Sequence, residues 1–167
     1  MKKHNKKKIG SLLSLMLVLL VIRNLLVVDM AKMETNDNKA DRSSLLKFAS
    51  QFIGNPYVWG GTSLTKGADC SGFVQSVYRQ YGYDLPRLAE DQAKCGVQVP
   101  VEDAQPGDLI FYAKEGYVYH VVIYAGEGKT IEAMNPDMGI VQGNVDTVNA
   151  VWASRILNER FHLQIDN

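Results

Sequence analysis

The sequence is poor in the residues that bind metals or redox cofactors. Its 167 residues include two cysteines and three histidines. Neither a Cys-x-x-Cys nor a His-x-x-x-His spacing occurs, and zinc sites are usually built on such short spacings. Gly60-Gly61 is not followed by the Lys-Ser or Lys-Thr ending of a phosphate-binding loop. We therefore predict no metal and no cofactor.

An excess of one charge is also missing, because 18 lysines and arginines balance 18 acidic residues. The two signs are unevenly placed along the chain. Residues 1–43 hold nine basic and four acidic residues, whereas residues 44–167 hold nine basic and fourteen acidic residues. A nucleic-acid-binding domain needs a basic face. We therefore predict no nucleic-acid partner.

One cysteine, Cys70, lies where a glycine-rich turn meets an amphipathic helical pattern. Asp69 is the expected N-cap of this helix and Gly82 its expected end. The first turn of a helix presents unpaired N–H groups and partial positive charge, and both favour a reactive thiolate. The alternative is a buried structural cysteine. Between the two ends, apolar side chains recur at helical spacing at Phe73, Val74, Val77, Tyr78 and Tyr81.

A nucleophilic thiol needs a base, and His120 is the best-placed histidine for this role. His4 lies in a lysine-rich leader, and His162 lies within the last six residues. His120 falls in a run of β-branched and aromatic residues that predicts a strand over 117–125. A lone strand histidine is more often structural, but an imidazole paired with a thiol can exchange its proton.

Glu132 is a candidate for orienting the imidazole. A turn signal at 126–128 separates two extended patterns, and a hairpin centred on Gly126 would place Glu132 directly opposite His120. The carboxylate could then accept a ring N–H. A two-residue loop would shift the register by one residue and turn Glu132 to the other face. The prediction therefore requires an odd-numbered loop, and the alternative is an ordinary surface glutamate.

Five motifs, in this order along residues 44–156, resemble those of the NlpC/P60 cell-wall cysteine peptidases. The resemblance implies an α+β fold with a papain-like core, in which N-terminal helices pack on an antiparallel sheet. It also implies hydrolysis of peptidoglycan stem peptides, typically between D-γ-glutamate and the following diamino acid. The motifs are Asn55-Pro56-Tyr57-Val58-Trp59-Gly60-Gly61-Thr62, Asp69-Cys70-Ser71-Gly72-Phe73-Val74, Leu85-Pro86-Arg87, Pro106-Gly107-Asp108-Leu109-Ile110-Phe111 and His120-Val121-Val122-Ile123-Tyr124.

By this resemblance, Cys70 is the nucleophile and His120 the base. Glu132 occupies the third polar position, which varies among His, Asn, Gln and Glu in the family. The second cysteine, Cys95, is predicted to be a packed free thiol, because a disulfide would consume the nucleophile.

The resemblance also implies a group of substrate-binding residues. Tyr57 matches a tyrosine beside the nucleophile, whose hydroxyl can help to polarise the oxyanion. Asp69 and Ser71 match residues that hold the free amino end of the stem peptide in some members, although Asp69 has the alternative role of helix cap. Arg87 matches the Pro-Arg of the family, and its alternative is a solvated surface charge.

The N-terminus has the anatomy of an export signal. Five lysines precede a charge-free apolar stretch from Ile9 to Ile22, and apolar residues resume after Arg23 and Asn24 up to Val28. As a helix, this stretch would span roughly 30 Å of hydrocarbon. No small-x-small cleavage site and no lipid-bearing cysteine follow it. An uncleaved anchor is therefore favoured over a released protein.

Three segments are predicted: a signal-anchor or signal peptide at 1–28, a flexible polar linker at 29–43 and a catalytic domain at 44–167. The basic N-terminal flank predicts that the domain lies outside the cytoplasm, anchored in the membrane or secreted to the wall. Within the domain, helices at 44–52 and 70–82 precede antiparallel strands, an order that favours the α+β class. The strands are expected near 108–112, 117–125, 129–134, 139–142 and 150–156.

Three functions compete on this sequence. The first is an exported, monomeric peptidoglycan endopeptidase whose partners are stem peptides and, through the N-terminal helix, the membrane. The second is an amidase or a transglutaminase-like acyl transferase on the same Cys/His core. The third is a wall-binding module that has lost activity, although the intact Cys70/His120 pair argues against it.

Overall fold

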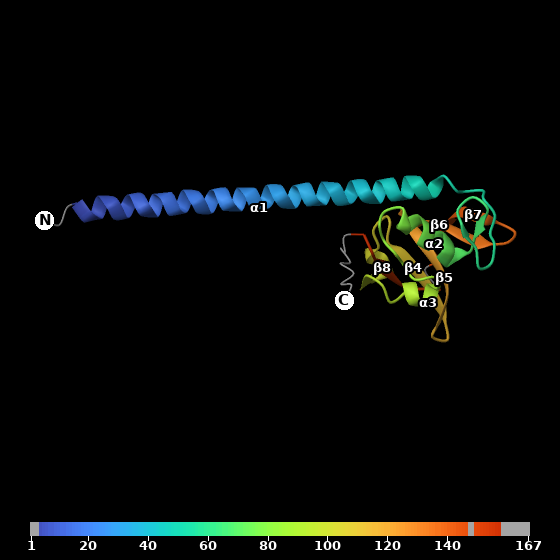
Figure 1. Ribbon diagram of the computed structural model, residues 1–167. Coiled ribbons are helices and arrows are strands. Elements are labelled where there is room, and N and C mark those ends of the chain that lie inside the picture. Colours follow the sequence, from blue (N-terminus) through green and yellow to red (C-terminus); the bar gives the residue numbers. More distant parts are fainter. Residues whose placement is uncertain (1–3, 147–148, 158–167) are drawn as a thin grey trace, which may run out of the picture. The chain divides into compact units, whose positions relative to one another are not determined.

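The computed structural model of the chain describes residues 4–146 and 149–157. Two compact units make up the chain, residues 1–39 and residues 40–167. The first unit contains the greater part of the helix α1 (His4–Ser50), and the second contains the end of α1 and all other elements (Figure 1). The predicted boundary of the catalytic domain at residue 44 stays a prediction.

Helix α1 runs without interruption through residues 29–43. The predicted flexible linker is therefore wrong as a description of the local structure. The physical reason is that polar residues alone do not end a helix, and neither glycine nor proline occurs between Ser11 and Ile53. In α1, the apolar side chains of 16–22 and 25–28 are exposed. Among the residues that the structure describes, no helix has the length and apolar character needed to cross a membrane.

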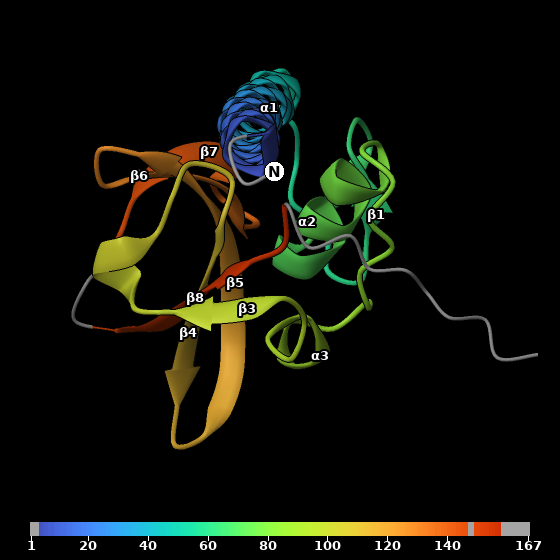
Figure 2. The same cartoon turned by 90° about the vertical axis from the view of Figure 1, so that its left-hand side faces the viewer.

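The second unit contains a six-stranded antiparallel sheet in the order β3-β8-β4-β5-β6-β7. Five of these strands were predicted from the sequence, and the short first strand, β3, was missed. Figure 2 shows the strands as a curved sheet with α2 beside it. The strands are β3 (Val97–Val99), β4 (Leu109–Lys114), β5 (Tyr117–Gly126), β6 (Lys129–Asn135), β7 (Gly139–Asn144) and β8 (Ala150–Arg155).

Helix α2 (Cys70–Arg79) packs against β5 and β6. Its buried residues include four of the five apolar residues in the predicted spacing, Phe73, Val74, Val77 and Tyr78, whereas Tyr81 lies beyond the helix and is partly buried. The Asp69 N-cap is confirmed, because its carboxylate accepts the N–H of Gly72 at 2.8 Å. The helix ends three residues before Gly82, whose φ of 83° suits the left-handed turn that follows. The smaller elements are β1 (Thr62–Ser63), β2 (Gly67–Ala68), α3 (Ala89–Gln92) and the 3-10 helix η1 (Val101–Asp103).

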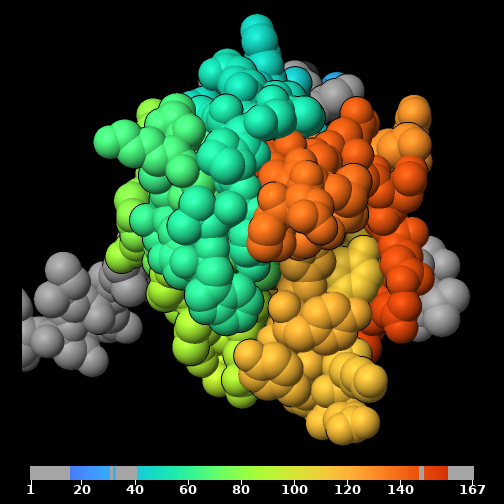
Figure 3. Space-filling model, turned by 90° about the vertical axis from the view of Figure 1, so that its right-hand side faces the viewer, coloured from blue at the N-terminus to red at the C-terminus, as the bar shows by residue number. Residues whose placement is uncertain are grey.

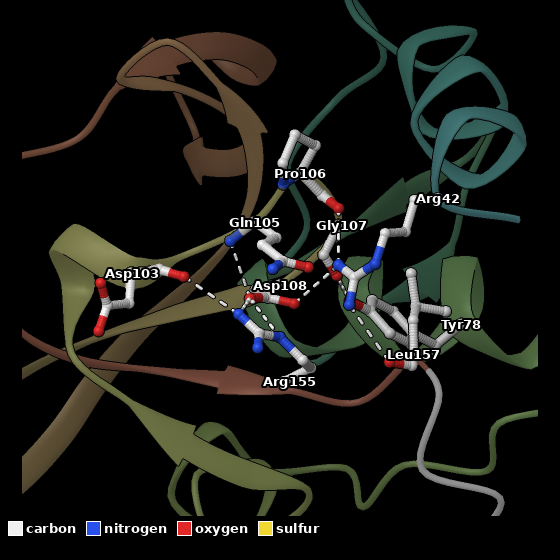
Figure 4. Close-up of polar contacts among 9 residues, drawn as sticks. All are labelled: Arg42, Tyr78, Asp103, Gln105, Pro106, Gly107, Asp108, Arg155 and Leu157. Carbon is white, nitrogen blue, oxygen red and sulfur yellow. Dashed lines mark hydrogen bonds and ion pairs between the residues drawn. The ribbon is translucent and has the colours of Figure 1, made fainter. Parts of the chain in front are cut away.

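A buried cluster of charges joins three distant parts of this unit. Asp108 is fully buried and pairs with Arg42 of α1 at 2.8 Å and with Arg155 of β8 at 3.1 Å (Figure 4). Arg42 also donates to the carbonyls of Pro106 and Leu157, at 2.8 and 3.2 Å. In the sequence, Asp108 stood out only as part of the motif Pro106-Gly107-Asp108. The structure adds that its carboxylate ties the end of α1 to the sheet.

Candidate active site

Cys70 is the first residue of α2 and opens onto a cleft of about 670 Å³. One part of the lining comes from Tyr57, Trp59, Gly60 and residues 69–71 and 87–90, and the other part comes from the strands β4 to β7. Cys70 is partly buried and is a free thiol. A sealed structural cysteine, the alternative left open by the sequence, does not fit this position.

The segment that carries Tyr57 is held against β7. The N–H of Ile140 donates to the carbonyl of Asn55, and the N–H of Gly54 donates to the carbonyl of Ile140, both at 2.8 Å. Figure 3 shows this contact from outside, where the teal-green segment that follows α1 lies beside the orange β6–β7 region. These bonds fix one edge of the cleft to the sheet.

His120 lies on β5 between Cys70 and Glu132. Its Nε2 is 2.7 Å from Oε2 of Glu132, and the two side chains are 18% and 5% exposed. The bond to Glu132 uses Nε2, which leaves Nδ1 as the ring nitrogen available to a second partner. Burial by itself lowers the pKa of His120, but hydrogen bonds to Cys70 and Glu132, and their negative charges, raise it to about 9. These neighbours therefore favour the protonated form of the ring.

Glu132 reaches His120 by a route that differs from the predicted one. Ile123 pairs with Ile131, and continuing this register would place Met134, not Glu132, opposite His120. The loop has two residues, which alone would turn Glu132 to the other face. An irregularity between Tyr124 and Gly126 adds one residue and restores the face. The predicted odd-numbered loop is wrong, whereas the predicted contact between Glu132 and His120 is confirmed.

Two residues at this site were not singled out from the sequence. Thr130 donates its hydroxyl to Oε1 of Glu132 at 2.6 Å. The ring of Tyr112 lies 5.8 Å from that of His120, centroid to centroid, and its hydroxyl accepts the N–H of Asp146 at 3.3 Å. A signal for Thr130 was present, because residues two apart on a strand share a face. Tyr112 carried no comparable signal.

Asp69, Ser71 and Arg87 form one hydrogen-bonded group. Asp69 accepts from Arg87 Nη2 at 2.6 Å and from Gly60 N–H at 2.9 Å on one oxygen, and from Ser71 and Gly72 on the other. Arg87 also donates to Ser71 Oγ at 3.0 Å. The helix-cap role of Asp69 is therefore realised, and its charge is paired with Arg87. Arg87 is not the solvated surface charge considered as its alternative.

Tyr57 lines the cleft beside Cys70. Burial, followed by the negative charges of Cys70 and Asp69, raises the pKa of Tyr57 above its ordinary value of 10.0. Its hydroxyl therefore keeps its proton at neutral pH and can donate a hydrogen bond. Cys95 is a free thiol, as predicted. Within the described ranges, no group of three His, Cys, Asp or Glu residues is placed to hold a metal ion.

Comparison with known proteins decides which family has this arrangement. The NlpC/P60 family profile matches residues 54–160, more than half of the chain. The chain belongs to the NlpC/P60 family. This family consists of cysteine peptidases that act on peptidoglycan. The resemblance carried by the five sequence motifs is thereby confirmed.

Named relatives and solved structures agree with this assignment. The chain is 42% identical over 101 residues to gamma-D-glutamyl-L-lysine dipeptidyl-peptidase of Bacillus subtilis, covering 59% of this chain and 34% of that protein. It is 39% identical over 101 residues to peptidoglycan endopeptidase RipB of Mycobacterium tuberculosis, covering 53% of this chain and 42% of that protein. The chain thus spans about a third of the length of the first of these relatives.

Solved structures of NlpC/P60 domains share the fold. The NlpC/p60 domain of peptidoglycan hydrolase SagA matches with a TM-score of 0.64 and 35% identity, over 69% of this chain and 98% of that one. RipB of Mycobacterium tuberculosis matches with a TM-score of 0.67 and 31% identity, over 73% of this chain and 67% of that one. The predicted α+β, papain-like NlpC/P60 core is confirmed.

Proposed function

We propose that the chain is an exported peptidoglycan endopeptidase that cleaves stem peptides at the bond between D-γ-glutamate and the diamino acid. Cys70 is the nucleophile, His120 exchanges the proton and Glu132 orients His120. The observation that carries this proposal is that Cys70, His120 and Glu132 line one open cleft, with Nε2 of His120 2.7 Å from Oε2 of Glu132. The names of the relatives support the substrate, since one is a gamma-D-glutamyl-L-lysine dipeptidyl-peptidase and another a peptidoglycan endopeptidase.

The nucleophile of the proposed reaction is the thiolate form of Cys70, and His120 is its proton partner. The sulfur of Cys70 attacks the γ-carbonyl carbon of D-glutamate, and the carbonyl oxygen takes up the negative charge. The hydroxyl of Tyr57 and the N–H groups at the start of α2 are the donors available to this oxyanion. When the C–N bond breaks, His120 gives its proton to the leaving amine of the diamino acid, and a thioester remains on Cys70.

Hydrolysis of the thioester completes the cycle. Neutral His120 takes a proton from a water molecule, whose oxygen attacks the thioester carbonyl. The C–S bond then breaks, and the thiolate and the imidazolium are regenerated together with a free γ-carboxylate on D-glutamate. Throughout these steps Glu132 accepts the Nε2–H of His120 and keeps Nδ1 directed toward the reacting atoms.

We place the stem peptide along Tyr57, Asp69, Ser71 and Arg87, which line the cleft together. Because Asp69 is already paired with Arg87, this group presents a nearly neutral set of donors and acceptors. Such a group is suited to hold the polar backbone and end groups of a short peptide. A free amino end would have to compete with Arg87 for the carboxylate of Asp69.

The pH dependence of activity should follow His120. The protonated ring is needed to supply a proton to the leaving amine, so kcat/KM is expected to fall as the pH rises through about 9. Glu132→Gln removes the negative charge that favours the imidazolium. The decrease of kcat/KM at alkaline pH should then begin at a lower pH. Measurement of kcat/KM from pH 6 to 10 for both proteins tests this, and identical alkaline limbs would contradict it.

Mass spectrometry of defined muropeptides tests the proposed reaction directly. Full-length protein is expected to release products with a new free D-glutamyl end. An amidase would instead free the sugar from the peptide, and an acyl transferase would add the mass of an amine acceptor. A wall-binding module would leave the muropeptides intact. Any of these three product patterns would overturn the proposed reaction.

We further propose that the protein acts outside the cytoplasm as a monomer and that residues 1–28 anchor it in the membrane. The argument is the basic flank and the fully apolar exposed surface of α1 over residues 16–22 and 25–28. The full-length chain is expected to sediment with membranes and to remain there after a high-salt wash. Recovery of the mature protein, without residues 1–28, from the culture medium would contradict anchoring.

A further inference from the structure

A buried hydrogen bond continues the series beyond Glu132. Glu132 is 4% exposed and Thr130 is not exposed at all. One carboxylate oxygen, Oε2, lies 2.7 Å from His120, and the other, Oε1, accepts the hydroxyl of Thr130 at 2.6 Å. Both oxygens of a buried carboxylate are thus satisfied from two sides, a condition that fixes its orientation.

The neighbouring strand leaves room for this pair. Gly143 of β7 lies directly across from Thr130 in the register. A Cβ atom on Gly143 would lie 2.4 Å from Oε1 of Glu132 and 2.7 Å from Oγ1 of Thr130, both closer than real Cβ contacts. The backbone of Gly143 is not in the left-handed region, so conformation does not explain the glycine. The glycine is explained by the space that the Glu132–Thr130 hydrogen bond requires.

We propose that Thr130 is a positioning residue that holds the carboxylate of Glu132 toward His120 and so maintains the imidazolium, with Gly143 providing the space. The catalytic meaning of this inference rests on the proposed function, in which His120 must carry a proton. The hydrogen bonds themselves do not depend on any substrate. Thr130 is not itself among the residues that line the cleft, and its hydroxyl donates to Glu132, which is.

The physical reason lies in the two oxygens of the carboxylate. A carboxylate can rotate about its last side-chain bond, which is a soft torsion. Loss of the Thr130 hydroxyl would leave Oε1 buried without its donor, at the full desolvation cost of a charged group. The carboxylate would then turn toward another donor or take up a proton. In either case His120 loses part of the negative charge that stabilises its protonated form.

The test is the titration of His120 in full-length protein by NMR, with His120→Gln used to assign the resonance. Thr130→Val keeps the shape of the side chain but removes the hydroxyl, and it is expected to weaken proton binding by His120 about tenfold. Thr130→Ser keeps the hydroxyl and should titrate like the wild type. Glu132→Gln gives the reference for complete loss of the charge, and Thr65→Val, at an exposed position, is the control for the substitution itself.

Gly143→Ala provides a second variant, because its methyl group would overlap Oε1 of Glu132 and Oγ1 of Thr130 while residue 130 keeps its hydroxyl. It should weaken proton binding by His120 in the same direction as Thr130→Val. A Thr130→Val protein that folds and titrates at the wild-type pH, or at a higher pH, would overturn the proposal. If Thr130→Val does not fold, the titration of Gly143→Ala decides, and an unshifted midpoint overturns the proposal.

The outcome is independent of the outcome for the proposed function. The titration needs no substrate, so a wild-type protein that cleaves no muropeptide can still show the Thr130-dependent shift. If the protein is an endopeptidase, Thr130→Val should lower kcat with little change in KM, because the substrate does not contact Thr130. Thr130→Ser should restore kcat, which a purely structural defect in the strand would not explain.

Discussion

Cys70→Ala is expected to abolish muropeptide hydrolysis, with a loss of at least about 10³-fold in kcat/KM. The reason is that no other described side chain in the cleft is a thiol, and the thioester route disappears with the sulfur. The substitution should have little effect on the stability of the fold. Cys70 is at the start of α2 and only partly buried, so the melting temperature should move by no more than about 2 °C.

The chain offers a matched control for this variant. Cys95 is the other free thiol and is likewise partly buried, but it lies outside the cleft lining. Cys95→Ala should therefore keep the wild-type rate in the same assay. Hydrolysis that survives in Cys70→Ala, or disappears equally in both variants, would remove Cys70 from the mechanism.

Asp108→Ala should have the largest effect on stability, a loss of about 3 kcal/mol in the free energy of unfolding. The variant leaves Arg42 buried and without its carboxylate, and it also removes the acceptor of the Gln105 N–H. The estimate is at the low end for a buried ion pair because the side chain of Arg155 is 24% exposed and retains access to water. For a unit of this size, the melting temperature should fall by about 10 °C.

An exposed acidic residue gives the comparison for Asp108. Asp84→Ala breaks the pair between Asp84 and Arg79, whose side chains are 71% and 57% exposed, and should cost no more than about 0.5 kcal/mol. Thermal and urea unfolding of both variants measure the difference. At a temperature where Asp108→Ala is folded, its kcat/KM should equal that of the wild type. Equal stability losses in the two variants would contradict the anchoring role of Asp108.

The positions of the candidate site residues and most of the fold could be predicted because their signals are local. The apolar spacing after Cys70 defines helix α2, and a run of β-branched and aromatic residues defines the strand of His120. With only three histidines in the chain, the partner of the thiol followed by elimination. The NlpC/P60 motifs then supplied the order of the elements and the third polar position, Glu132.

The features that sequence reasoning missed depend on non-local geometry. The residue that restores the face of Glu132 is inserted between Tyr124 and Gly126, and no turn signal marks such an irregularity. The pairing of Asp69 with Arg87 joins positions 18 residues apart through the fold. The continuation of α1 through 29–43 shows a different limit. A polar segment without glycine or proline is equally compatible with a helix and a linker.

The buried positions of Glu132, Thr130 and Gly143 illustrate the same limit. Each is unremarkable in the sequence, since glutamate and threonine are usually exposed and glycine is common in turns. Their meaning appears only when β6 and β7 are placed side by side and the carboxylate is found between them. The roles of these three residues can be recognised only once the pairing of β6 with β7 is known.

The central claim is that His120 is protonated beside Cys70 when the enzyme is at rest. The NMR titration of His120 in the wild-type, full-length protein tests it most directly. We predict an imidazolium at pH 7.5 and a titration midpoint at about 9. A neutral ring at pH 7.5, with a midpoint at or below the ordinary value of 6.5, would contradict the account.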